Sequence, residues 1–191
     1  LRTMGLGSPR TTATQEGMAT FAELITNAID LPRLRRLALR VKAIQMGLDG
    51  ADFIDLFRFF LEAGQTLEES FYSAARVFRG GDVRGRVVFT KDVVYLQGLI
   101  SVHTFFLQAI HQGRPEYIRD LFAGRMALGD VLDLDAYFRA GAIAPPRYEP
   151  AWIKNQPALA AFLIYSIFNT RLEVGGMSLA DFKEPPPDPE R

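Results

Sequence analysis

The sequence contains no cysteine and only two histidines among its 191 residues. Without cysteine the chain forms neither a disulfide nor a thiolate zinc site. His103 and His111 are eight residues apart, which on one helix corresponds to a rise of about 12 Å. Zinc–nitrogen bonds are about 2 Å long, so these imidazoles cannot share one zinc ion. We therefore expect no zinc in this chain alone, and we expect His103 to be a core histidine.

An excess of charge of one sign is also missing, because 22 basic side chains balance 22 acidic ones. This balance argues against nucleic acid and anionic membranes as partners. The most apolar run, residues 158–168, is shorter than the roughly 20 residues that a membrane span requires. The chain opens with a polar, glycine-rich stretch and not with a signal peptide. We expect no membrane segment and a cytoplasmic location.

The composition, 48% hydrophobic and 23% charged, is typical of a globular chain. Apolar residues recur with helical spacing, and no segment has a convincing strand pattern. The sequence predicts an all-α fold, a multi-helix bundle with a long central apolar helix. We expect a single helical domain over residues 1–184 and a disordered tail over residues 185–191, which begins with three prolines.

Capping residues and glycines give the expected helix boundaries. Thr12 and Thr66 each begin a segment with capping-box spacing, and Asp30 precedes a helix that stops at Gly50. Thr90 is expected to cap the central helix, which is apolar on nearly every side. The predicted helices cover residues 12–28, 31–48, 51–63, 66–79, 90–111, 115–123 and 131–140, with a last one from residue 157.

The first predicted helix has one apolar face and one polar face. Its core face is expected to carry Met18, Phe21, Ala22, Ile25 and Ile29, with Glu16, Thr20, Glu23 and Asn27 opposite. Glu16 is thus expected to point away from the core. This orientation fits either a solvent-exposed residue or a residue that lines a cleft. Gly17 either permits close approach of another helix or is a chance helical glycine.

Three segments form a pattern along the chain. They are Gln15-Glu16-Gly17-Met18, the Arg-Val-Phe-Arg-Gly-Gly sequence at 76–81, and the Phe-Thr-Lys-Asp-Val-Val-Tyr-Leu-Gln-Gly-Leu sequence at 89–99. In this order they resemble the QEGLA-motif family, described as flavohaemoglobin expression-modulating proteins and related to the microtubule-associated tyrosine carboxypeptidases. The resemblance runs from about residue 5 to about residue 170.

The resemblance implies a zinc-peptidase-like protein in which the glutamate of the QEG segment is the third metal ligand. Glu16 is therefore the candidate metal ligand, although a glutamate there also suits the helix dipole. The family's two histidine ligands and catalytic glutamate lie on an upstream helix that this chain lacks. The chain thus resembles the C-terminal part of a larger protein, inactive as a fragment and partnered by its missing N-terminal segment.

Three further polar residues are candidates for contacts with a substrate. Arg79 and Lys91 would bind the C-terminal carboxylate of a peptide or protein, and Tyr95 would donate to a developing oxyanion. Lys91 and Tyr95 are four residues apart and so share a helix face. The alternative is that Arg79 and Lys91 pair with Asp82 or Asp92 while Tyr95 packs in the core.

These features lead to two functional hypotheses. The resemblance implies carboxypeptidase-like hydrolysis at a peptide's C-terminus in the complete protein, with zinc as cofactor. The alternative is a non-enzymatic regulatory module or a helical protein-interaction module. An apolar face left uncovered by a missing segment would also favour a homodimer.

Overall fold

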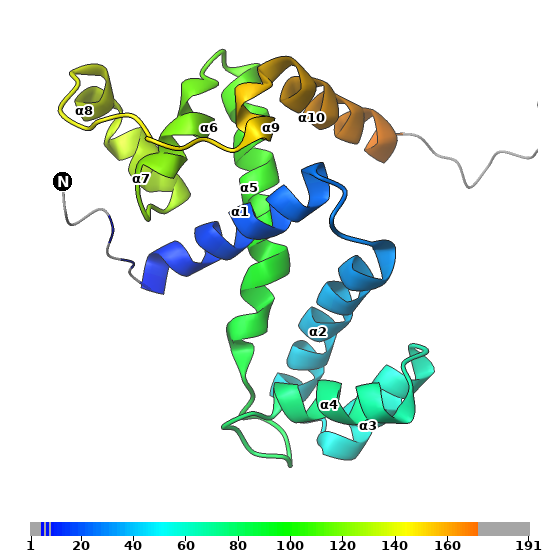
Figure 1. Cartoon of the computed structure of the whole chain (residues 1–191). Helices are drawn as coiled ribbons and strands as arrows, with labels where there is room; N and C mark the ends of the chain where they lie inside the picture. Colours follow the sequence, from blue (N-terminus) through cyan, green and yellow to red (C-terminus); the bar gives the residue numbers. More distant parts are fainter. Residues whose placement is uncertain (1–4, 6, 8, 172–191) are drawn as a thin grey trace, which may run out of the picture.

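The computed structural model describes residues 5, 7 and 9–171, and in this part of the chain every regular element is a helix. The predicted all-α fold is confirmed (Figure 1). The expected domain limit at residue 184 and the expected tail over residues 185–191 lie outside the described residues.

The helices follow one another with short connections. In chain order they are η2 (Pro9–Thr11), α1 (Thr12–Ile25), α2 (Leu31–Asp49), α3 (Phe53–Glu62), α4 (Leu67–Val77), η3 (Thr90–Asp92), α5 (Val93–His111), α6 (Glu116–Asp120), η4 (Leu121–Ala123), α7 (Leu128–Asp133), α8 (Asp135–Arg139), α9 (Ala151–Lys154) and α10 (Gln156–Arg171).

The long apolar helix predicted over residues 90–111 is the centre of the fold. Figure 1 shows α1 crossing α5 near its middle, with α2 beside one half of α5 and α6 and α10 at its other end. By length and composition alone, Thr90–His111 is apolar enough to cross a membrane, a test that core helices of soluble proteins also pass. Here α5 packs against α1, α2, α6 and α10.

Two apolar cores lie along α5. The larger surrounds Phe21 of α1, whose ring meets Phe106 of α5 edge-on at 4.9 Å between centroids. Trp152 and Phe162 close this cluster, 5.5 and 6.0 Å from the Phe21 ring centroid. The smaller core joins α2, α3 and α4 and consists of Ala43, Ile44, Leu56, Phe60, Ala74, Val77 and Phe78.

Two glycines allow α1 and α5 to touch through their backbones. A Cβ atom added to Gly17 would lie 2.3 Å from the carbonyl carbon and oxygen of Gly98. A Cβ atom added to Gly98 would lie 2.2 Å from the carbonyl oxygen of Ala13. No side chain fits at either position, so the expectation that Gly17 permits close approach is confirmed.

Some expected caps are present and others are not. The Asp30 side chain accepts from the Arg33 amide at 2.7 Å, and Thr66 forms a capping box with Glu69. Gly50 ends α2 with φ 112°. The caps expected from Thr12 and Thr90 are wrong, because the 3₁₀ turns η2 and η3 come first and neither α1 nor α5 has a side-chain cap.

The expected polar face of α1 is partly wrong. Thr20 is buried, because the glycine contact brings α5 against that side of α1. Its hydroxyl donates to the Glu16 carbonyl at 2.8 Å, which satisfies it within the helix. Leu67 and Phe71 of α4 are exposed, although both are apolar, because α4 is packed through its later residues against α2 and α3.

The helix predicted over residues 131–140 is interrupted. The chain instead forms α7 and α8, with Leu134 between them in a non-helical conformation. The short helix α9 was not predicted, and it brings Trp152 to the larger core. Both changes lie at the end of the molecule near α6.

Replacing Gly98 by alanine should destabilise the fold, because the added methyl would clash with the Ala13 carbonyl. We expect the free energy of unfolding to fall by about 3 kcal/mol, the upper end of overpacking costs, in urea denaturation followed by circular dichroism. Gly129→Ala is the control, since Gly129 is helical and nothing lies within 4 Å of an added methyl. It should stabilise the chain by up to about 1 kcal/mol. Equal stability of the two variants would contradict a tight crossing.

Candidate functional site

Glu16 and Lys91, two of the four predicted site residues, line the same cavity. This cavity, called the Glu16 cavity below, has a volume of about 450 Å³ and lies between the first turns of α1 and η3. Its lining residues are Gly7, Thr11, Thr12, Gln15, Glu16, Lys91 and Arg125.

The contact between Gly17 and Gly98 fixes the relative position of Glu16 and Lys91. Glu16 directly precedes Gly17 in the sequence. Lys91 lies about two helical turns before Gly98. Glu16 is half-buried, and Lys91 is exposed at the rim. The close backbone approach of α1 and α5 therefore brings a carboxylate and an ammonium group to one opening.

Arg125 is a site residue that the sequence analysis missed. Arg125 follows η4 in the chain. A Cβ atom added to Gly7 would lie 3.3 Å from Nη1 of Arg125, so the guanidinium group packs over Gly7. Arg10 forms an ion pair with Asp130 of α7, which ties the segment before α1 to the part of the chain that carries Arg125. Nothing in the sequence around Arg125 indicates this long-range contact.

The Glu16 cavity has an excess of positive charge. Among the described residues, neither Lys91 nor Arg125 has a carboxylate within ion-pair distance. Gln15 adds a buried Nε2 donor that has no hydrogen-bond partner in the described part of the chain. Two cations and one amide donor around a single carboxylate favour an anionic ligand with hydrogen-bond acceptors.

The other two predicted site residues do not line this cavity. The Arg79 guanidinium lies over the Phe89 ring, 4.1 Å from its centroid. Tyr95 is half-buried and interacts electrostatically with Arg40 and Arg76. Lys91 belongs to η3 and Tyr95 to α5, so the predicted shared helix face is wrong and the two side chains have different neighbours.

An ion pair between buried Asp92 and partly exposed Arg76 holds the segment that carries Lys91. Asp92 is buried, and Arg76 of α4 donates to it from Nε and, at 2.9 Å, from Nη2. These hydrogen bonds raise the pKa of Arg76. Asp82 pairs instead with Arg84, so the alternative pairing of Asp82 and Asp92 with Arg79 and Lys91 is not what the described residues form.

The histidines are not at the cavity. The Nε2 atom of His103 lies 2.8 Å from the Ser166 hydroxyl, and its ring is 6.4 Å from the Phe21 ring. Burial lowers the pKa of His103, which favours the neutral imidazole. His103 is thus a half-buried, hydrogen-bonded histidine at the edge of the larger core, close to the expected core histidine, while His111 is exposed in the last turn of α5.

The donor set does not fit a zinc ion. Within the described ranges, no three histidine, cysteine, aspartate or glutamate side chains come together as a metal site requires. Of the residues that the structure describes, Glu16 is the only one with a carboxylate that lines the Glu16 cavity. One carboxylate does not complete a tetrahedral zinc site, so no catalytic step through zinc follows from these residues.

A comparison with protein families identifies the relationship. The family model for microtubule-associated tyrosine carboxypeptidases matches residues 1–171. The chain belongs to the microtubule-associated tyrosine carboxypeptidase family. No curated protein and no solved structure matches it. The relation to carboxypeptidases predicted from the motifs is therefore confirmed, and the match includes α1 and η3, which carry the Glu16 cavity's carboxylate and lysine.

Replacing Arg76 by methionine in this carboxypeptidase relative should destabilise the fold, because buried Asp92 would lose its cation. We expect a loss of about 1–2 kcal/mol in the free energy of unfolding, since partial exposure of Arg76 moderates the cost. Urea denaturation at neutral pH measures it. Arg84→Met removes an exposed pair on Asp82 and should leave stability nearly unchanged. Similar losses in both variants would show that the buried pair has no special weight.

Proposed function

We propose that this chain is the substrate-facing, C-terminal part of a zinc-dependent carboxypeptidase-like hydrolase of the QEGLA type. The observation that carries the proposal is that Glu16, from the QEG segment, shares a cavity with two cations that have no acidic partner in the described part of the chain. Membership of the tyrosine carboxypeptidase family supports hydrolysis at the C-terminus of a peptide or protein.

In this proposal Lys91 and Arg125 bind the terminal carboxylate of the substrate. Charge-assisted hydrogen bonds from two cations select a free C-terminus over an internal peptide bond, which has no charge. The buried Gln15 amide donates to the same group. Arg79 and Tyr95 were predicted as substrate contacts, and in this arrangement they contact substrate only if their side chains move, because they lie outside the cavity.

Glu16 is proposed as one zinc ligand. The remaining ligands and the catalytic base would come from an N-terminal segment of the same protein, since the described residues bring no histidine to the cavity. That segment is the proposed partner of the face around Glu16. This chain without it would bind zinc weakly and have no peptidase activity. The cytoplasm is the proposed location, with no nucleic acid or membrane as partner.

A second candidate is a non-enzymatic regulatory or interaction module. Ile164, Tyr165 and Phe168 on α10 are each more than half exposed, and the rings of Tyr165 and Phe168 stack. Such a group of exposed apolar side chains favours association with another helix or with a second copy of the chain. A homodimer is compatible with both candidates.

The carboxylate-binding part of the proposal is tested by peptide affinity. A fluorescent peptide ending in tyrosine should bind the chain more tightly with a free C-terminal carboxylate than with a C-terminal amide. Lys91→Met and Arg125→Met should each weaken binding of the free acid about tenfold, the value of one charged hydrogen bond. Fluorescence anisotropy measures both.

Arg147→Met is the matched control, because Arg147 is an exposed arginine outside the Glu16 cavity. It should leave the affinity unchanged. Equal binding of the acid and the amide, or equal losses in Arg147→Met and Arg125→Met, would remove the cavity as a carboxylate site. Thermal unfolding of each variant separates a binding defect from a folding defect.

A further inference from the structure

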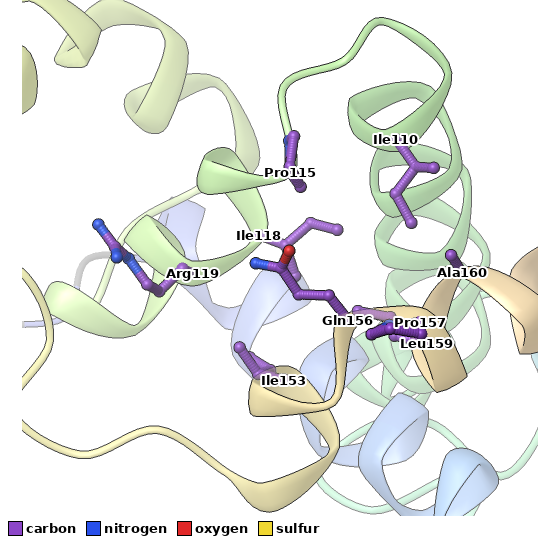
Figure 2. Close-up of a pocket in the computed structure, with 9 residues that line it drawn as sticks. All are labelled: Ile110, Pro115, Ile118, Arg119, Ile153, Gln156, Pro157, Leu159 and Ala160. Carbon is purple, nitrogen blue, oxygen red and sulfur yellow. The ribbon is translucent and has the colours of Figure 1, made fainter.

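A second cavity lies beside the end of α5, among α6, α9 and α10 (Figure 2). Its volume is about 320 Å³, and it shares no lining residue with the Glu16 cavity. Its lining is mainly aliphatic and consists of Ile110, Pro115, Ile118, Arg119, Ile153, Gln156, Pro157, Leu159 and Ala160.

The walls of this aliphatic cavity are held in place by the larger core. Ile118, Ile153 and Leu159 border the cavity, yet each is at most 3% exposed because its other sides pack into the core. Pro115 and Pro157 add backbone of restricted conformation at the edge. The cavity is therefore preformed, and its volume falls at the small end of the range of about 300–1,000 Å³ found for ligand pockets.

The polar groups of this cavity are at one end. Figure 2 shows the Gln156 amide turned toward Ile118, with Arg119 beyond it and the guanidinium directed away from Leu159 and Ala160. Arg119 Nε lies 3.8 Å from Asp120 and 4.0 Å from Glu149. Both contacts are long ion pairs and neither is a hydrogen bond, so rotation of Arg119 toward the amide of Gln156 gives up two weak ion pairs and no hydrogen bond.

The backbone at the start of α10 does not provide an anion site of its own. Pro157 has no N–H group, and the Ala158 amide already donates to the Asn155 side chain at 3.2 Å. The Leu159 amide donates to the Asn155 carbonyl. Recognition of a charged group at this end therefore depends on the side chains of Gln156 and Arg119.

We propose that this cavity binds an aliphatic monocarboxylate of medium chain length. The hydrocarbon chain packs among Ile110, Ile118 and Ile153, and the carboxylate accepts from the Gln156 amide and the Arg119 guanidinium. Among the described residues, Arg119 is the only charged side chain of the lining, and once turned away from Asp120 and Glu149 its guanidinium group pairs with an anionic head. The site lies apart from the Glu16 cavity and does not depend on the proposed peptidase function.

Octanoate titrated into the full chain tests this proposal. We expect saturable shifts of the Ile118 and Ile153 methyl signals in nuclear magnetic resonance spectra, with a dissociation constant below about 1 mM. Octanol, which has the same chain length without the charge, should bind about tenfold more weakly. Arg119→Met should weaken octanoate to the level of octanol and leave octanol binding unchanged.

Arg147→Met is again the control, since Arg147 is an exposed arginine that does not line the aliphatic cavity. The Arg147→Met variant should bind octanoate as tightly as the natural chain does. Ala160→Phe fills the cavity and should abolish binding of both octanoate and octanol. If the Ala160→Phe variant fails to fold, the Arg119→Met variant tests the proposal. Failure of octanoate to saturate the isoleucine signals would overturn the proposal. So would equal affinity for octanol and octanoate, or an Arg119→Met variant with unchanged octanoate binding.

Discussion

The contact between Gly17 and Gly98 determines how closely α1 approaches α5, and the other contacts of both helices depend on that distance. Because the two backbones touch, Phe21 reaches Phe106 and Trp152 on one side of the crossing. On the other side, Glu16 reaches the opening that Lys91 borders. A larger side chain at either glycine would therefore have two effects. It would separate the Glu16 carboxylate from Lys91, and it would loosen the packing of Phe21 in the aromatic core.

Electrostatics divides the basic residues near this crossing into two groups. Arg76 is committed to the buried carboxylate of Asp92, and this ion pair fixes η3. Burial lowers the pKa of Arg40, and the positive charge of neighbouring Arg76 lowers it further. Lys91 and Arg125 have no such partner among the described residues, which leaves them available to an anionic ligand at the Glu16 cavity.

Local sequence rules predicted the features that depend on neighbouring residues. The caps at Asp30 and Thr66 and the glycine end of α2 follow from short-range hydrogen bonds, and the structure has them. The apolar character of residues 90–111 correctly indicated the central helix. The exposure of Leu67 was not predictable, because it depends on which helix covers α4.

The site was predictable only in part, for the same reason. The QEG segment indicated Glu16 because the family pattern consists of residues that are adjacent in the sequence. Arg125 reaches the cavity through a contact over more than 100 residues of chain, which no local pattern records. Gly98 likewise gave no signal of its own, since its role appears only where α1 crosses it.

The central claim is that the glycine crossing brings Glu16 and Lys91 to one cavity, which Arg125 also lines. The chain has no cysteine, so paired replacements introduce the only two thiols. A short bifunctional thiol reagent should cross-link the Glu16→Cys/Lys91→Cys and Glu16→Cys/Arg125→Cys chains efficiently, and should not cross-link Glu16→Cys/Arg84→Cys. Adding Gly98→Leu should abolish the cross-links. Equal yields in all three pairs, or cross-links that survive Gly98→Leu, would contradict the account.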